Sequence, residues 1–453
     1  MKFRQEKDSI GLVNVPENAY WGAQTERSFE NFPQGVEKMP KSQIMAIVMV
    51  KKSAAIVNNK EGKLDDRRKN LIVEASDRIL KGEFDKEFPL TVWQTGSGTQ
   101  TNMNVNEVIA HIANEKAGEN IIHPNDHVNM SQSSNDVFPT AMHLSTLINL
   151  RDKLHKELNQ TVDTLKKLED ENKIIKTGRT HLQDATPLRV SQEISAWRTS
   201  IERNHEVLAK VIPSLKMLAI GGTAVGTGIN AKKEFGNDMA KELSNITGFD
   251  LKSDENKFYQ LSSKSSLVNC HGVLKALATD LYKMANDIRF LSCGPRCGIG
   301  ELIIPANEPG SSIMPGKVNP TQVESLTMIS IQIMANDFAI SMANSQGQIE
   351  LNAYMPLIIY NMDQSIILLA KSLACFREKL LKKLRVNEDK IKENLDKSLM
   401  LVTALSPHIG YDKASEIAKY AYKKQLTLKQ ASLELGYLSE KEFDEYVDVE
   451  KMV

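Results

Sequence analysis

Three long apolar stretches at helical spacing constrain the fold more than any other feature of this sequence. Residues 321–346 and 357–384 have apolar side chains on more than one helical face, which is typical of helices that are buried on most sides. Residues 262–291 place theirs in alternating steps of three and four over about four heptads, the period of left-handed helix packing. That third seam consists of Leu267, Cys270, Leu274, Leu277, Leu281, Met284, Ile288 and Leu291. The three runs predict a mainly α fold around a long central helical bundle, with some helix faces buried against other subunits.

The change in character along the chain predicts three domains in these 453 residues. Residues 1–130 mix turn signals with one amphipathic helix near residues 65–81, so we expect a mixed N-terminal domain. Residues 131–388 contain the long helical runs and few helix breakers, which predicts the central bundle. Residues 389–453 hold shorter amphipathic pieces and predict a small C-terminal helical domain.

Charge and cysteine content exclude several classes of protein. The chain has 57 Lys+Arg against 57 Asp+Glu, so it lacks the basic excess of a protein that wraps nucleic acid. Its four cysteines are sparse, and the Cys293–Cys297 pair lacks the second pair that a zinc site needs. The N-terminus has charges of both signs, and no run of about 18 uninterrupted apolar residues occurs. We therefore expect a cytoplasmic protein with no metal, no membrane partner and no nucleic-acid partner.

The most unusual segment is EPGSSIMPGKVNP at residues 308–320. Its three prolines and two glycines cannot belong to a helix interior. Ser311, Ser312, Lys317 and Asn319 offer donors that suit an anion, and the loop ends where a long helix begins. We expect Asn319 to cap that helix with Gln322 as the capping-box partner, so that the helix N-terminus adds positive potential beside Lys317.

Three other polar segments carry chemistry of the same kind. TGSGTQTNMNVNE at 95–107 and SQSSND at 131–136 are rich in hydroxyl and amide groups, and GRTHLQD at 178–184 contributes His181, a candidate acid or base. None matches a nucleotide or dinucleotide fingerprint, and GGTAVGTG at 221–228 predicts an ordinary turn. Taken together, the segments suit a small carboxylate substrate that is handled by acid/base catalysis without a cofactor.

The loop GSSIMPGKVNP at 310–320 resembles the signature of the fumarase/aspartase superfamily. Further segments resemble class II fumarases in the same order along nearly the whole chain. They are NAYWGAQTERS (18–28), TGSGTQTNMNVNEVI (95–109), HPNDHVNMSQSSND (123–136), KTGRTHLQDATPL (176–188), AIGGTAVGTG (219–228) and CGPRCGIGE (293–301). Aspartases typically have Gln in place of His181 and Ala in place of Gly316, and both positions here are those of a fumarase.

The resemblance implies hydration of fumarate to L-malate through an aci-carboxylate, without metal or organic cofactor, in a homotetramer whose active sites are shared between subunits. It assigns Ser311 as the base, His181 as the group that exchanges protons with water, and Glu324 as the residue that orients His181. The resemblance also assigns the remaining residues that bind the substrate carboxylates and the water: Ser97, Thr99, Ser133, Ser134, Asn135, Thr180, Ser312, Lys317 and Asn319.

The segment at His123, Asn125 and Asp126 resembles a second dicarboxylate site. Asn120 stands where some relatives have an arginine, which predicts weak anion binding there. Arg189 stands where many relatives have a small or apolar residue, and we expect it to be a surface substitution. Two alternatives to fumarase remain at this point, an ammonia-lyase acting on aspartate and a catalytically silent helical scaffold.

Overall fold

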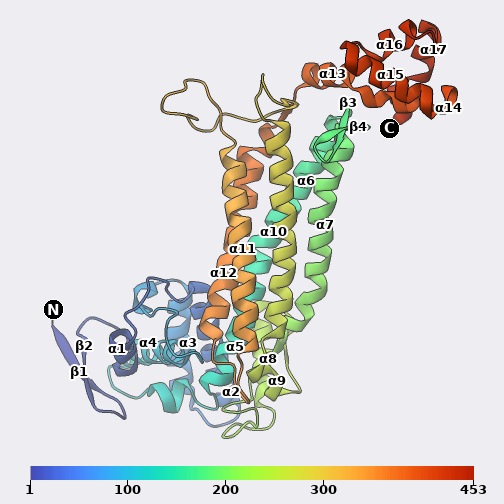
Figure 1. The fold of residues 1–453 in the computed structure, drawn as a ribbon. Coiled ribbons are helices and arrows are strands. Elements are labelled where there is room, and N and C mark those ends of the chain that lie inside the picture. The colour runs from blue at the N-terminus through green and yellow to red at the C-terminus, as the bar shows by residue number, and fades with distance from the viewer. Residues whose placement is uncertain (1) are drawn as a thin grey trace. The chain divides into compact units, whose positions relative to one another are not determined.

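The structure is a computed structural model that describes residues 2–453 (Figure 1). These residues divide into two compact units. Of the described residues, unit 1 contains residues 2–156, Asn204–Ala278 and Ile331–Ala370. Unit 2 consists of Glu157–Arg203, Thr279–Ser330 and Lys371–Val453. Helices dominate both units, and the named strands of the described residues form four two-stranded sheets, which confirms the mainly α prediction. The division at residues 130 and 388 stays a prediction.

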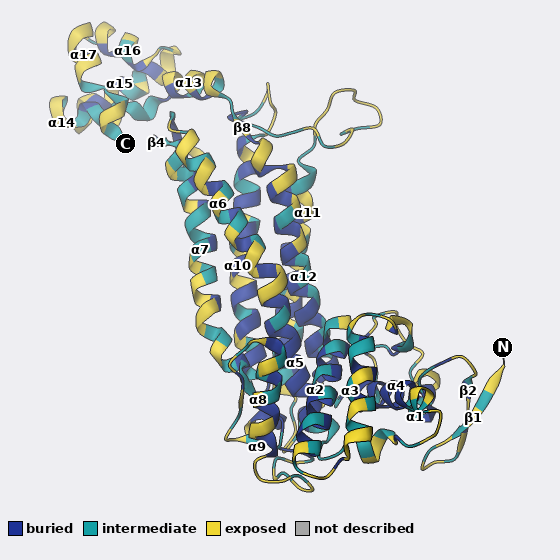
Figure 2. Ribbon diagram, turned by 180° about the vertical axis from the view of Figure 1, so that it is seen from behind, coloured by how far each residue is buried: buried dark blue, intermediate teal, exposed yellow. Residues whose placement is uncertain are grey.

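The long apolar stretches form long helices. Four of them contribute residues to both units: α7 (Val190–Leu215), α10 (Ser265–Leu291), α11 (Thr321–Ser345) and α12 (Met355–Lys379). All eight residues of the predicted α10 seam, from Leu267 to Leu291, are buried. Figure 2 shows buried stretches along α10. The heptad spacing therefore identified the packed face of this helix correctly.

Unit 1 is organised around α2 (Lys41–Lys60), which packs against α3, α4, α5 and α8. The sequence of α2 is apolar on nearly every face, and Ile47, Val50 and Ala54 are fully buried, as expected for a central helix. The other elements of unit 1 are β1 (Phe3–Lys7), β2 (Leu12–Pro16), α1 (Ala23–Asn31), α3 (Asp66–Leu80), η1 (Asp85–Glu87), α4 (Thr99–Ala117), η2 (Pro124–Val128), α5 (Ser134–Asn149), η3 (Leu150–His155), β5 (Met217–Leu218), α8 (Phe235–Thr247), β6 (Lys252–Ser253) and α9 (Lys257–Ser262).

Unit 2 contains the antiparallel hairpin of β3 (Ile175–Thr180) and β4 (Gln183–Arg189), together with the C-terminal helices. Capping boxes at Thr427 and Ser439 start two of those helices. Arg189 donates to Glu450 at 2.6 Å and so joins β4 to η6. The other elements are α6 (Lys156–Glu171), β7 (Leu302–Ile303), η4 (Leu381–Lys383), β8 (Arg385–Val386), α13 (Glu388–Lys397), η5 (Leu399–Leu405), α14 (Ser406–Ile409), α15 (Tyr411–Lys424), α16 (Leu428–Glu434), α17 (Glu440–Tyr446) and η6 (Val449–Met452).

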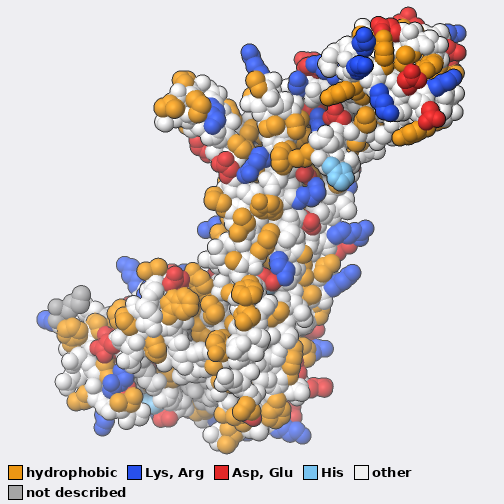
Figure 3. Space-filling view, viewed as in Figure 1, with side chains coloured by type: hydrophobic (Ala, Val, Ile, Leu, Met, Phe, Trp, Pro, Cys, Tyr) orange, Lys and Arg blue, Asp and Glu red, His pale blue; other side chains and the backbone are white. Residues whose placement is uncertain are grey.

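Helix α11 keeps a row of large apolar side chains at the surface of the chain. Met328 is 66% exposed, Ile331 55%, Phe338 69% and Met342 47%. Figure 3 shows hydrophobic side chains at the surface of the long-helix region. Among the described residues, α11 is the one helix that is long and apolar enough to cross a membrane, but core helices of folded proteins also meet that criterion. In the single chain α11 therefore keeps one apolar face uncovered, and the prediction that some helix faces are buried against other subunits stays a prediction.

Candidate active site

The first group of predicted residues lies at the start of α4 in unit 1. Ser97 and Thr99 are half-buried, and their hydroxyl oxygens lie 2.8 Å apart. Gly98 between them has φ 71°, and a Cβ there would come within 2.2 Å of the Phe138 ring. Glycine is thus required for the tight entry into the helix, which brings two hydroxyls to its N-terminus. Such a terminus attracts anions through its free N–H groups.

The second group of unit 1 lies at the start of α5. Ser133 caps the helix and forms a capping box with Asp136, whose carboxylate accepts from the Ser133 N–H at 2.9 Å. The same buried carboxylate accepts from the N–H groups of Gly221 (3.0 Å) and Thr223 (2.9 Å), while burial raises the pKa of Asp136. Residues 221–228 form the predicted turn, and the structure shows that this turn packs on the Ser133–Asn135 segment: the Asn135 amide donates to the carbonyl of Ala224 at 2.8 Å.

Asn102 joins these two groups. Its Nδ2 donates to Oγ of Ser134 at 3.0 Å from within α4. A buried amide side chain thus ties the start of α5 to α4, the helix that begins at Thr99.

His181 occupies a strained position in unit 2. It follows Thr180 at the tip of the β3–β4 hairpin, and His181 (φ 56°) and Leu182 (φ 59°) both have left-handed backbone conformations. Two-residue hairpin turns of this kind favour Asn and Gly, so the His181-Leu182 pair adopts this backbone conformation at a cost in free energy. Strain of this kind is concentrated at functional sites. The imidazole and Thr180 are both exposed.

Three cation–carboxylate contacts hold the base of this hairpin. Glu301 is 1% exposed and lies 2.7 Å from Arg179 and 2.9 Å from Lys176, and Lys176 also pairs with Glu193 at 3.0 Å. Although burial opposes it, these two cations hold the pKa of Glu301 below its usual value. The result is a rigid support directly before Thr180.

The loop at residues 308–320 also lies in unit 2 and surrounds a hollow of about 550 Å³. Oγ of Ser311 accepts from the N–H groups of Ile313 (3.2 Å) and Met314 (3.0 Å). A Cβ on Gly310 would approach the Lys317 carbonyl to 2.0 Å, so only glycine permits this close turn. Ser312 and Lys317 are exposed.

The predicted capping box at the start of α11 is wrong. The helix begins at Thr321, and the Asn319 amide donates to the carbonyl of Gly310, at 2.5 Å, instead of accepting from the helix. Gln322 accepts from the thiol of Cys375 at 3.3 Å. Asn319 thereby closes the loop, and the exposed carboxylate of Glu324 lies in the first turn of α11.

The segment at His123–Asp126 forms a self-contained turn. Nδ1 of His123 accepts from the N–H groups of Asn125 (3.3 Å) and Asp126 (3.2 Å), so the imidazole caps η2. Its side chain is 55% exposed and that of Asp126 75%. Within residues 2–453, no cluster of three or more His, Cys, Asp or Glu side chains is placed to hold a metal ion.

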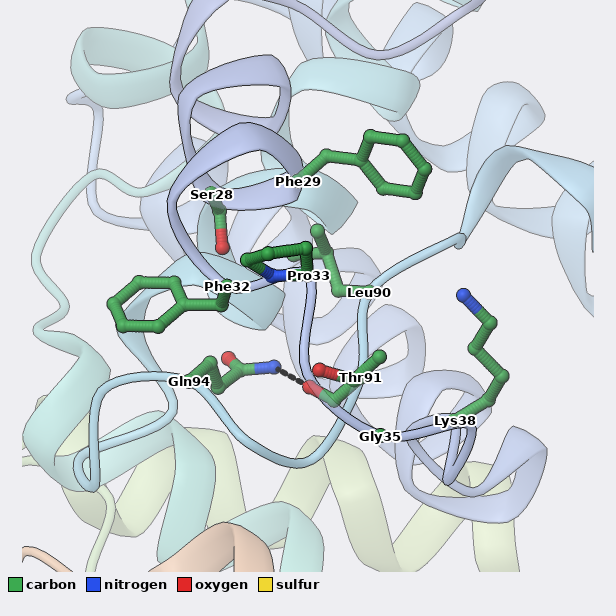
Figure 4. A pocket seen from close by; sticks show the side chains of 9 residues that line it. All are labelled: Ser28, Phe29, Phe32, Pro33, Gly35, Lys38, Leu90, Thr91 and Gln94. Atoms are coloured by element: carbon green, nitrogen blue, oxygen red, sulfur yellow. Dashed lines mark hydrogen bonds between the residues drawn. The ribbon is translucent and has the colours of Figure 1, made fainter.

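A separate pocket in unit 1 contains none of the predicted residues (Figure 4). It measures about 180 Å³ and lies between α1 and the segment before α4, where the Gln94 amide donates to the carbonyl of Thr91 at 2.6 Å. The predicted binding and catalytic residues therefore lie outside this pocket, one set in unit 1 and the other in unit 2. The sequence did not predict the buried polar side chains next to the unit 1 set, above all Lys51. The one indication in the sequence was a lysine within an otherwise apolar helix.

Comparisons with known proteins agree along the whole length of the chain. The Lyase family matches residues 11–335, and the family described as Fumarase C C-terminus matches residues 401–453. A protein of Campylobacter jejuni named "Fumarate hydratase class II" is 54% identical over 100% of this chain and 99% of its own length, and one of Bacillus subtilis with the same name is 52% identical with the same coverage. The crystal structure of recombinant class II fumarase from Schistosoma mansoni superposes with a TM-score of 0.97 at 43% identity and covers 99% of both chains.

Proposed function

Since the chain belongs to the class II fumarase family of lyases, we propose that it catalyses the reversible hydration of fumarate to L-malate. The observation that carries this proposal is the identity of 54% over the full length to a protein named fumarate hydratase. His181 and Gly316, the two positions at which the resemblance separates fumarases from aspartases, support the same choice.

The contacts of Ser311 support its role as the base that removes a proton from the carbon next to a malate carboxylate. A serine hydroxyl is a weak base, and its alkoxide needs stabilisation. Two backbone N–H groups already point at Oγ of Ser311, and Lys317 and the N-terminus of α11 belong to the same segment. Hydrogen bonds to a charged form favour that form, so this arrangement lowers the cost of the alkoxide.

In the hydration direction, a water oxygen bonds to one alkene carbon of fumarate, and His181 takes the proton that this water releases. The electron pair of the alkene moves into the neighbouring carboxylate and forms the aci-carboxylate, which receives its proton at carbon from Ser311. Lys317, Asn319 and Ser312 would stabilise the charge that develops, which is the largest contribution expected for such a reaction. Ser97, Thr99, Ser133, Ser134, Asn135 and Thr180 would hold the carboxylates and the water, and Glu324 would orient His181.

We also propose a cytoplasmic homotetramer with shared active sites. The exposed residues of α11 recur at steps of three and four through Met328, Ile331, Ala335, Phe338 and Met342. This is the a/d spacing of a helix that packs against another helix, and a second copy of the chain supplies one. The occupant of this face would then be α11 or another bundle helix of a neighbouring subunit.

A direct assay tests the proposed activity. The purified protein is mixed with fumarate, and the loss of fumarate ultraviolet absorbance is followed together with the formation of L-malate. We expect turnover in both directions without added metal. Release of ammonia from aspartate would instead identify an ammonia-lyase, and failure to turn over either substrate by the folded, assembled protein would identify a silent scaffold.

A further inference from the structure

Lys51 is a fully buried lysine behind the predicted binding residues of unit 1. It lies on α2, and its Nζ donates to Oδ1 of Asn129 at 2.8 Å and to Oε1 of Gln132 at 3.0 Å. The other lysines that anchor α2 to neighbouring elements pair with carboxylates: Lys41 with Asp85, Lys52 with Asp77 and Lys60 with Glu242. Lys51 differs from them because its hydrogen-bond partners are neutral amides.

A chain of hydrogen bonds leads from Lys51 to Ser134. Oδ1 of Asn129 also accepts from Nδ2 of Asn102 (3.2 Å) and of Asn106 (3.3 Å), both on α4. Nδ2 of Asn102 uses its second proton to donate to Oγ of Ser134 at 3.0 Å. One run of contacts therefore connects the ammonium group to both segments that carry predicted binding residues.

The donor-to-acceptor direction of these hydrogen bonds follows from the chemistry of the lysine. A protonated ammonium is a donor only, so Asn129 must present its oxygen to it. Asn102 and Asn106 must then present their NH₂ groups to Asn129, and their own oxygens are buried without a partner among the described residues. Because Asn102 donates to Ser134, the Ser134 hydroxyl accepts at that contact and keeps its own proton for another acceptor.

We propose that Lys51 is a positioning residue that fixes the direction of this chain, so that Ser134 donates its hydroxyl proton to a carboxylate of the substrate. The inference rests on the proposed function, which supplies a dicarboxylate. Lys51 acts through Asn129, Asn102 and Ser134 and is not itself a catalytic residue.

The charge state of Lys51 should make the KM for fumarate depend on pH. Burial lowers its pKa to about 7, while Asp136 on α5 opposes that shift, and the side chains that accept from Lys51 are amides. A neutral amine has a lone pair and no longer enforces a single direction. The KM for fumarate should therefore rise as the pH increases through this value.

The experiment compares Lys51→Met with Lys52→Met, the same change at the next position of α2. We expect Lys51→Met to raise the KM for fumarate and the dissociation constant of succinate, an unreactive dicarboxylate, about tenfold, with a smaller change in kcat. This factor corresponds to the loss of one charge-assisted hydrogen bond. Lys51→Met should also lose the rise of KM with pH, while Lys52→Met should keep both constants and the pH profile.

A double-mutant cycle with Ser134→Ala separates positioning from a general structural effect. If Lys51 acts through Ser134, Lys51→Met should change succinate affinity less than twofold in the Ser134→Ala background. A KM within twofold of wild type in Lys51→Met, or a tenfold effect that persists in that background, overturns the inference.

Two further measurements keep the inference testable. If Lys51→Met does not fold, Asn129→Leu breaks the chain in its middle and should weaken succinate binding by a similar factor. An unchanged affinity there also overturns the inference. Succinate binding by calorimetry needs no turnover, so a wild-type protein that binds succinate but leaves fumarate unchanged refutes the proposed function and leaves the Lys51 inference to be judged by succinate affinity.

Discussion

Glu301→Gln tests whether the buried charge cluster of unit 2 supports the hairpin that carries His181. The carboxylate accepts from both terminal nitrogens of Arg179 (3.0 and 2.7 Å) and from the Asn394 amide (3.0 Å), and it lies 2.9 Å from Nζ of Lys176. Glutamine keeps the shape and one acceptor but removes the charge. Lys176, which is 2% exposed, then retains a single carboxylate partner, Glu193.

The expected cost is about 3 kcal/mol in the free energy of unfolding. Removal of one partner of a buried ion pair typically costs about 3–5 kcal/mol. Glu193 still neutralises Lys176, and the side chain of Arg179 is 16% exposed and gains some hydration, so the lower end of that range applies. The turnover of fumarate should fall as well, since Arg179 lies two residues before His181 in the strained turn.

The effect of pH follows from the lowered pKa of Glu301. A carboxyl group whose pKa is lower in the folded than in the unfolded state stabilises the fold fully above the unfolded value of about 4.3. This contribution is lost as the pH falls through the lower, folded value. The difference between wild type and Glu301→Gln should therefore be constant near pH 7 and should shrink below about pH 4.

Urea unfolding followed by circular dichroism measures this difference, with all variants at one protein concentration because the proposed subunit association would also stabilise the fold. Glu393→Gln is the matched control, since Glu393 pairs with Lys390 and Lys397 on the surface and its loss should leave the unfolding midpoint unchanged. A Glu301→Gln protein within about 0.5 kcal/mol of wild type at pH 7 would refute this account of the cluster.

Three further changes test other parts of the molecule. Ser311→Ala should lower kcat at least a hundredfold while succinate affinity changes little; weaker binding with normal kcat would make Ser311 a binding residue instead. Phe338→Glu places a charge on the exposed apolar row of α11 and should reduce the mass of the proposed tetramer, measured by light scattering; a mass equal to that of the wild type would exclude this face from a subunit interface. His271→Ala removes an imidazole that lies 3.0 Å from Asp337 and 2.8 Å from Ser365 inside the protein, and it should cost roughly 2–4 kcal/mol in the free energy of unfolding, measured by urea titration.

Helix positions and the packed seam of α10 could be predicted from the sequence because periodicity reports burial directly. The predicted helix at 65–81 is α3, Asp66–Leu80, and the runs beginning near residues 262 and 321 are α10 and α11. Periodicity does not say what covers a face, so the exposed side of α11 could not be distinguished from a buried one. A single chain leaves that face open, although its spacing indicates a packed helix.

Local rules failed where a loop closes on itself. Asn319 before Pro320 matches the sequence pattern of a helix cap, but the amide instead donates to the carbonyl of Gly310. The carbonyl of a tight glycine turn competes for the same side chain, and that turn is a tertiary feature of the loop. The left-handed conformation of His181 could not be predicted from the sequence either, because neither His nor Leu is a residue that hairpin turns favour.

The chain has zero net charge, and its buried lysines differ in what surrounds their ammonium groups. Lys51 and Lys176 are buried within the two units, and each is held by acceptors that face it. Lys176 is neutralised by carboxylates and supports the fold of a hairpin, whereas Lys51 is bound by amides, which solvate its charge without cancelling it. A buried ammonium without an ion-pair partner is costly to the fold, and the proposed role of Lys51 in orienting the Ser134 hydroxyl through Asn129 and Asn102 gives a reason for this one.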